Sequence, residues 1–271
     1  MITFPNAKIN LGLYITAKRS DGYHNLQSCF VPIAWQDALE ILLAEEFSLS
    51  ISGLEVSGNL EDNLCYKAYQ ILSTKYPLSP VHIFLHKAIP MGAGLGGGSA
   101  DATFTLKMLN QLFDLKIDNQ ELANYASQLG SDCAFFIENT PKFCFEKGDQ
   151  MRPIRLPQLK KKHLVLVYPN FGISTQEAYA GIKPKAIDFD LQERLEQAPL
   201  ETWKNWLYND FEAHLFVKYP ILAQIKQQLY EQGAIYAAMS GSGSTIFGIF
   251  EEEPDKSFFA NYTCKFTQFL F

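Results

Sequence analysis

The feature that most constrains this chain is a cluster of glycines. Five of its 17 glycines fall within residues 92–98, in the segment PMGAGLGGGSADA at 90–102. The cluster follows a strand-like run at 81–86 and precedes apolar residues at helical spacing. Glycine lets backbone N–H groups approach an anion at a helix N-terminus, and Ser99 can cap the helix or contact a phosphate. The segment predicts a phosphate-binding loop, since a merely flexible linker needs no helix fused to its glycines.

Other phosphate loops fit this segment less well. Gly92, Gly94 and Gly97 match the dinucleotide fingerprint GxGxxG, and Asp118 lies about twenty residues further on. However, KAIPM separates the strand from the glycines and Asp118 falls between two helical patterns, which disfavours a dinucleotide fold. No Lys-Ser/Thr follows the glycines and no HRD or DFG occurs, so the sequence predicts neither a Walker A loop nor a protein kinase.

The N-terminal segment alternates apolar and polar residues over 8–16. This period of two predicts a half-buried strand with Ile9 and Leu11 on one face. Lys8 and Asn10 then share the opposite face. A lone strand lysine is usually a solvated surface residue.

The rest of the chain mixes short strands with helices and lacks regular βαβ alternation, which predicts an α+β fold of two lobes. The expected strands lie at 37–43, 47–51, 81–86, 134–137, 142–146 and 163–168, with SGSGS at 240–244 as a tight turn between two more. The expected helices lie near 65–76, 99–113, 122–129, 175–182, 201–207 and 219–232, with a linker at 183–200.

Charge and cysteine usage restrict the partners. The net charge is −6 and the pI is near 5.4, so nucleic acid is not an expected partner. Five cysteines without a CxxC motif predict reduced thiols and a cytoplasmic protein. No signal peptide or membrane span is predicted. His82 and His86 would stand ~13 Å apart in a strand, so they predict no zinc site.

Four motifs in order resemble those of the GHMP small-molecule kinases: PNAKINLGL, PMGAGLGGGSADA, LGSDCAFF and SGSGS. The segment RSDGYHNLQS at 19–28 is similar to the substrate segment of the members that act on a cytidine-diphosphate-linked methylerythritol. The resemblance implies a ribosomal protein S5 domain 2-like ATP-binding lobe over 1–155 and a ferredoxin-like α/β lobe over 156–271. It also implies ATP-dependent phosphorylation of the substrate's 2-hydroxyl in the non-mevalonate route to isoprenoids.

The same resemblance implies roles for individual residues. Asp132 matches the catalytic aspartate, which accepts the hydroxyl proton, and Lys8 matches the lysine beside that hydroxyl. Both are expected near the cleft between the lobes. Asn10 matches the asparagine that positions the substrate. Without the motifs, Asp132 reads as a turn or capping residue.

Binding residues follow in the same way. Tyr23 and Tyr179 are expected on opposite faces of the cytosine ring, with His24 reading its edge and Phe30 lining the pocket. The residues expected at ATP are Asn63, Lys87, Pro90, Met91, Gly92, Ala93, Gly94, Leu95, Gly96, Gly97, Gly98, Ser99 and Ala100. The chemistry implies Mg²⁺, and no metal ligand is assigned. The expected state is a monomer or weak homodimer that binds a small molecule and neither nucleic acid nor a membrane.

The sequence leaves two other functions open. One is another GHMP kinase, acting on homoserine or a mevalonate derivative, which the segment RSDGYH disfavours. The other is a non-catalytic nucleotide-binding module, which the presence of Lys8 and Asp132 disfavours. The glycine segment departs from the usual pattern at Thr103 and Phe104, where alanines are commoner, which bears on helix packing more than on catalysis.

Overall fold

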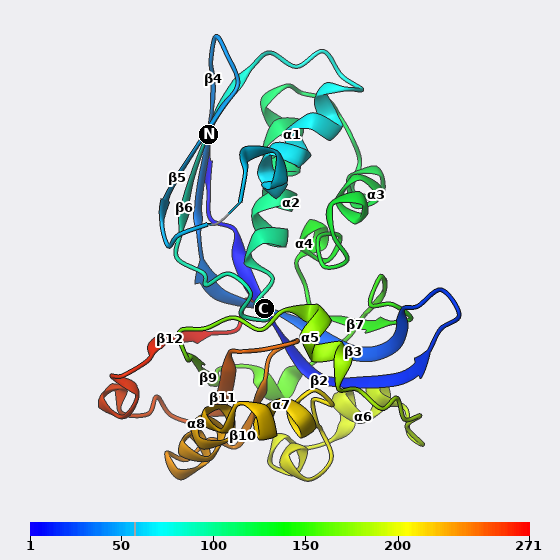
Figure 1. The fold of residues 1–271 in the computed structure, drawn as a ribbon, viewed down its shortest axis with the longest axis vertical. Helices are drawn as coiled ribbons and strands as arrows, with labels where there is room; N and C mark the ends of the chain where they lie inside the picture. Colours follow the sequence, from blue (N-terminus) through cyan, green and yellow to red (C-terminus); the bar gives the residue numbers. More distant parts are fainter. Residues whose placement is uncertain (57) are drawn as a thin grey trace. The chain divides into compact units, whose positions relative to one another are not determined.

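The computed structural model describes residues 1–56 and 58–271, which form two compact units that alternate along the chain (Figure 1). Unit 1 comprises residues 1–7, 35–91 and 96–139, and unit 2 comprises residues 8–34, 92–95 and 140–271. Neither unit is therefore a continuous segment. The α+β class is confirmed, whereas the division into 1–155 and 156–271 remains a prediction about domains.

Unit 1 is a four-stranded sheet with helices on one face (Figure 1). The strand order is β1 (Ile2–Thr3), β4 (Ala38–Leu43), β6 (Val81–Lys87), β5 (Ser48–Gly53). The helices are α1 (Leu64–Ser73), α2 (Gly97–Leu112), α3 (Asn119–Leu129) and α4 (Phe135–Glu138), with a 3-10 turn η1 (Leu60–Asp62). Apolar side chains alternate on β6, so that Val81, Ile83 and Leu85 pack against Leu106 and Leu109 of α2.

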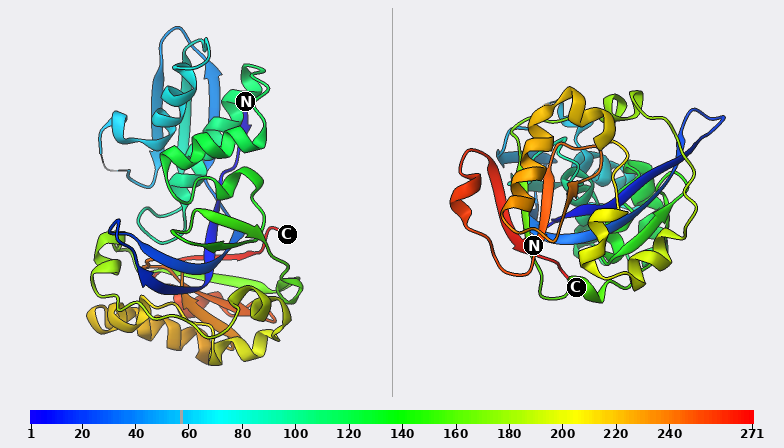
Figure 2. Two further views of the ribbon diagram at one scale, coloured as in Figure 1. Left: turned by 90° about the vertical axis from the view of Figure 1, so that its right-hand side faces the viewer. Right: turned by 90° about the horizontal axis from the view of Figure 1, so that it is seen from below.

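Unit 2 contains two further four-stranded sheets. One has the order β2 (Asn6–Lys18), β3 (His24–Gln36), β7 (Lys142–Phe145), β8 (Gln150–Pro153), and β2 with β3 forms a long hairpin (Figure 2). The other has the order β10 (Tyr236–Met239), β11 (Ile246–Phe250), β9 (His163–Tyr168), β12 (Thr263–Gln268). The remaining elements are η2 (Pro157–Leu159), α5 (Thr175–Ala180), α6 (Leu191–Gln197), η3 (Leu200–Asn205), α7 (Glu212–Lys218), α8 (Pro220–Glu231) and η4 (Lys256–Phe259). None of the helices in the described ranges is long and apolar enough to cross a membrane.

Three expectations from the sequence are wrong in detail. Strand β2, expected to be half-buried, is buried on both faces, because residues 206–207 cover the polar face: the Tyr14 hydroxyl donates to the Trp206 carbonyl at 2.5 Å, and the Leu207 side chain lies against Gly12. Residues 134–137, expected to form a strand, are the N-cap and first three residues of helix α4; a run of four apolar residues fits a short helix as well as a strand. The expected linker at 183–200 contains helix α6.

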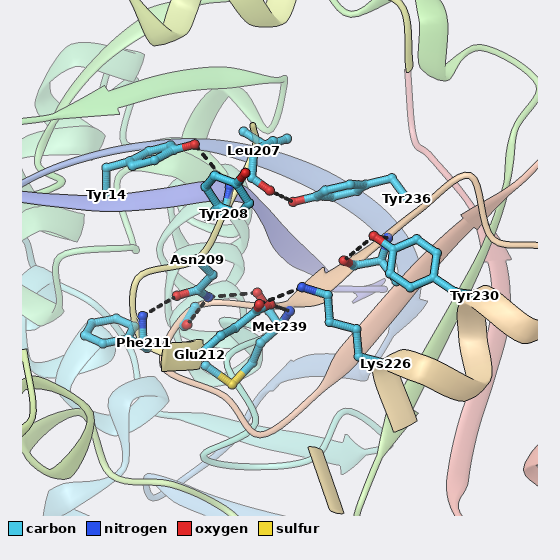
Figure 3. A network of polar contacts seen from close by, with 12 residues as sticks. Tyr14, Leu207, Tyr208, Asn209, Phe211, Glu212, Lys226, Tyr230, Tyr236 and Met239 are labelled. Atoms are coloured by element: carbon cyan, nitrogen blue, oxygen red, sulfur yellow. Dashed lines mark hydrogen bonds and ion pairs between the residues drawn. The ribbon is translucent and has the colours of Figure 1, made fainter. Parts of the chain in front are cut away.

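Asn209 fixes the entrance to the 240–244 turn (Figure 3). Its Nδ2 donates to the carbonyls of Met239 and Gly241, both at 2.8 Å, and its Oδ1 accepts the Phe211 N–H at 3.0 Å. Glu212, in α7, accepts the N–H of Met239 in β10 at 2.7 Å. The buried Asn209 and the half-buried Glu212 therefore hold the end of β10 by its backbone.

We predict that Asn209→Ala lowers the free energy of unfolding by about 3 kcal/mol, because it strands three buried backbone groups. Urea denaturation followed by circular dichroism measures the change. Asn205→Ala, at an exposed position nearby, is the control and shifts the value by less than about 0.5 kcal/mol. Equal effects of the two substitutions would contradict the assigned role of Asn209.

Candidate active site

The first half of the glycine loop, residues 92–95, is fastened to unit 2 by backbone contacts. Gly94 has a φ of +76°, and a Cβ there would lie 2.0 Å from the carbonyl oxygen of Ser240. The Ser240 hydroxyl donates to the Gly94 carbonyl at 2.8 Å, and Thr245 N–H donates to the Ala93 carbonyl at 3.2 Å. The SGSGS turn thus holds the glycine loop directly, and only glycine fits at 94.

A buried lysine lies beside this loop. The backbone N–H of Lys8 donates to the Leu95 carbonyl at 2.9 Å. Its ammonium donates to Asn10 Oδ1 at 2.6 Å and lies 4.5 Å from the centre of the Phe30 ring. Lys8 and Asn10 therefore share a face of β2, as the alternation predicts, although both are only 3% exposed.

Two serines that the sequence analysis did not name individually bond to Asn10, beside Lys8. Ser28 accepts Asn10 Nδ2 at 2.9 Å and donates to the Gly12 carbonyl at 2.6 Å. Ser240 accepts the Asn10 N–H at 3.3 Å. Both belong to motifs already recognised, RSDGYHNLQS and SGSGS, so membership in a motif was the only signal available for them. Ser28 thus fixes the orientation of the Asn10 side-chain amide, and Ser240 holds the Asn10 backbone.

The residues expected around cytosine also lie in unit 2. The rings of His24 and Tyr179 stack with centres 5.0 Å apart and planes 29° apart. The edge of Tyr179 also meets Phe211, at 5.0 Å. Tyr23 is 64% exposed, with the ammonium of Lys147 5.4 Å from its ring centre. His24 and Tyr179 are thus brought together, while Tyr23 presents its ring to solvent.

Unit 1 contains a cavity of about 370 Å³ beside the start of α2. Four of the residues expected at ATP line it, namely Asn63, Lys87, Met91 and Gly98. The apolar part of its wall includes Leu49, Ile51, Leu64 and Leu85. A mostly apolar pocket with a few polar groups is typical of a small-molecule site. Asn63 itself caps α1, with Oδ1 accepting the Cys65 N–H at 2.9 Å.

Helix α2 begins at Gly97, with Gly96 in the left-handed region as its N-cap. Ser99 therefore lies inside the first turn and is not the cap. A Cβ at Gly97 would lie 2.9 Å from Ile89 Cγ2 and 3.3 Å from Lys87 Nζ. The helix N-terminus thus packs closely on the segment that precedes the loop. The first N–H groups of a helix have no partner within the helix, so they can bind an anion.

The turn that carries Asp132 lies against the same helix. The Thr103 hydroxyl donates to the Cys133 carbonyl at 2.7 Å. A Cβ at Gly130 would lie 3.9 Å from Ser99 Oγ. Thr103, noted as a departure from the usual pattern, therefore anchors the Asp132 turn to α2. Asp132 belongs to unit 1 and Lys8 to unit 2, and their expected proximity remains a prediction.

Three buried ionisable side chains meet beside the cavity in unit 1, and two of them, Lys87 and Asp101, line it. Lys87 pairs with Oδ2 of Asp37 and, at 2.7 Å, with Oδ2 of Asp101. Burial lowers the pKa of Lys87, but the two carboxylates outweigh burial and raise it. Burial raises the pKa of Asp101 to about 7, against the opposing effect of the Lys87 charge and with a further rise from Asp37. We call Asp37, Lys87 and Asp101 the buried ion trio.

The described residues contain no group of three His, Cys, Asp or Glu side chains arranged to hold a metal ion. Mg²⁺ in kinases often takes its ligands from phosphate oxygens and water, with only one or two from the protein. Such an ion does not require a protein cage.

Comparison with known proteins defines the class. The family "GHMP kinases N terminal domain" matches residues 63–139, and "GHMP kinases C terminal" matches residues 191–266. The structure of a mevalonate kinase from Methanococcus jannaschii superimposes with a TM-score of 0.73 at 16% identity, over 100% of this chain and 98% of that one, and shows the shared fold. The chain is therefore a small-molecule kinase of the GHMP class, whose members use ATP.

Nearer relatives identify the family. The 4-diphosphocytidyl-2-C-methyl-D-erythritol kinases of Cytophaga hutchinsonii and Bacteroides fragilis are 52% and 53% identical, over 94% and 93% of both chains. The crystal structure of a 4-(cytidine 5'-diphospho)-2C-methyl-D-erythritol kinase is 28% identical, with a TM-score of 0.82 over 99% of both chains. The chain belongs to the 4-diphosphocytidyl-2-C-methyl-D-erythritol kinase family.

The raised pKa of Asp101 predicts a pH-dependent stability. Because the pKa rises from 3.8 to about 7 on folding, the folded state binds the proton more tightly, and protonation stabilises it. This contribution is complete below the unfolded pKa and is lost as the pH rises through the folded value. The free energy of unfolding of wild type and of Asp101→Asn is measured by urea denaturation at each pH. The wild-type value minus the variant value should fall between about pH 4 and pH 7 and then level off. A difference that does not change with pH would show that Asp101 does not titrate in this range.

Proposed function

We propose that this protein transfers the γ-phosphoryl group of ATP to the 2-hydroxyl of 4-diphosphocytidyl-2-C-methyl-D-erythritol, in the non-mevalonate route to isoprenoid precursors. The observation that carries the proposal is the buried Lys8, whose backbone bonds to the glycine loop at Leu95 and whose ammonium is oriented by Asn10. Phosphoryl transfer needs a positive charge fixed beside a phosphate cradle.

In the proposed reaction Asp132 accepts the proton of the attacking hydroxyl. The hydroxyl oxygen forms a bond to the γ-phosphorus, and the bond from that phosphorus to the β–γ bridging oxygen of ATP breaks, giving ADP and the phosphorylated product. Lys8 stabilises the negative charge that develops on the transferring group, and Asn10 orients the substrate. Backbone N–H groups of the loop and of the first turn of α2 bind the phosphates.

Nucleotide and substrate selection would use the remaining predicted residues. The cavity with Asn63 and Lys87 suits adenine, since it is mostly apolar. Mg²⁺ would arrive bound to ATP, where it neutralises phosphate charge. Tyr23, His24 and Tyr179 would hold cytosine, with Phe30 lining the same pocket. Free thiols at all five cysteines are consistent with a cytoplasmic enzyme, which we propose acts as a monomer or weak homodimer.

The proposal is tested by ADP release with a panel of alcohols comprising the cytidyl substrate, homoserine and mevalonate. We expect turnover of the cytidyl substrate only, and preferential turnover of homoserine or mevalonate would contradict the substrate assignment. Asp132→Asn should lower kcat by about 10²- to 10⁴-fold, because it removes the proton acceptor. Lys8→Met should lower kcat by about 10²- to 10³-fold.

Matched controls exist on the surface of unit 1. Asp114 and Lys116 form an exposed pair, with side chains 83% and 79% accessible. Asp114→Asn and Lys116→Met should leave kcat within about twofold, because exposed pairs contribute little. If Asp132→Asn retained the kcat of these controls, Asp132 would not be the proton acceptor.

The cytosine assignment has a separate test. Tyr23→Ala should raise KM for the cytidyl substrate by about 5- to 150-fold, because stacking on a base is worth ~1–3 kcal/mol, and should leave KM for ATP unchanged. Tyr23→Phe keeps the ring and serves as the control, with KM close to wild type. Steady-state kinetics with each substrate varied in turn measures both constants. An unchanged KM in Tyr23→Ala would remove Tyr23 from the substrate site.

A further inference from the structure

A single ammonium group joins the two segments that flank the glycine loop. Lys87 ends strand β6 just before the loop, and Asp101 lies in the second turn of α2 just after it. Asp37, the residue before β4, also holds the segment that enters the loop, because its Oδ1 accepts the N–H groups of Ala88 and Ile89 at 2.6 and 2.8 Å. The entry and exit of the loop are thus held at one point by the buried ion trio.

The trio cannot open without a large cost. The side chains of Lys87, Asp37 and Asp101 are 1%, 0% and 2% exposed. Moving α2 away from residues 87–89 would leave a buried charge without its partner, which is strongly destabilising. A Cβ at Gly97 would lie 3.3 Å from the same ammonium, so a side chain at this position would crowd the contact between the helix and Lys87. The trio therefore sets the distance between the two ends of the loop.

Asp101 differs from Asp37 in the number of its carboxylate oxygens that accept a hydrogen bond. Asp37 uses both oxygens, whereas Oδ1 of Asp101 has no hydrogen-bond partner among the described residues. A group with a purely structural role is expected to have its buried polar atoms satisfied. Lys87 and Asp101 also line the cavity of unit 1, and Asp37 does not. These differences associate Asp101 with the ligand site more than with the fold.

We infer that Asp101 is a positioning residue for the nucleotide: it holds the Lys87 ammonium at the cavity wall and fixes both ends of the glycine loop in the geometry that receives the phosphates of ATP. The inference rests on the proposed role of the loop in phosphate binding. Asp101 acts through Lys87 and through the start of α2, and it needs no contact with the reacting atoms.

Three variants test the inference. Asp101→Ala should raise KM for ATP by about 10- to 100-fold, because a small displacement of a binding loop is costly, while KM for the cytidyl substrate stays within about twofold. Asp101→Asn retains an oxygen that accepts from Lys87 and should restore KM for ATP to within about threefold of wild type. Asp114→Ala, at an exposed position, is the matched control and should leave both constants unchanged.

Calorimetric titration separates this inference from the phosphate assignment. Wild type should bind ADP more tightly than adenosine, and Asp101→Ala should lose most of that preference while its affinity for adenosine is retained. If wild type shows no preference for ADP, the phosphate role of the loop fails, and the inference fails with it. If wild type prefers ADP and Asp101→Ala does too, only the role of Asp101 is wrong.

Thermal unfolding distinguishes positioning from simple structural support. A lowered Tm in Asp101→Ala with an unchanged KM for ATP, or an equal rise in both KM values, would overturn the inference. If the alanine variant does not fold, Asp101→Glu replaces it, because it keeps the charge but moves the carboxylate by one methylene. A selective rise in KM for ATP in that variant supports positioning, and a wild-type KM contradicts it.

Discussion

The structure depends on a backbone that approaches its neighbours more closely than any side chain allows. At Gly94 a Cβ would overlap the carbonyl oxygen of Ser240, and at Gly97 it would press on Ile89. These two contacts attach one half of the loop to the 240–244 turn and the other half to the end of β6. The neighbour is a backbone carbonyl at Gly94 and the Ile89 side chain at Gly97, so a side chain at either position would press on what holds the loop.

Local patterns in the sequence predicted the parts of the site that depend on one segment at a time. Alternation over 8–16 correctly placed Lys8 and Asn10 on one face, because the side chains of a strand repeat every two residues. The glycine cluster correctly predicted the loop and the start of α2 to within two residues. The resemblance to GHMP kinases supplied the family, which no periodicity could give.

The remainder depended on contacts between distant segments. Asp37 lies 50 residues from Lys87 and Asn10 lies 230 residues from Ser240, and no local pattern links these positions. The same reason explains the burial of both faces of β2, because residues 206–207, far away in the sequence, cover one of them. Helix α4 was missed because a run of four apolar residues carries no period that separates helix from strand.

The charge of the protein explains why rigidity matters here. With 23 basic and 29 acidic residues, the chain offers no general attraction to anionic ligands, and salt screens what field remains beyond ~8 Å. Phosphates must then be bound by local dipoles, namely backbone N–H groups and a helix N-terminus, together with single fixed cations. Dipoles act over short distances, so such a site works only if its backbone is held in place. Buried bonds that tie the loop at Gly94, at Leu95 and at both of its ends meet that requirement, and the binding strength is then set by geometry more than by net charge.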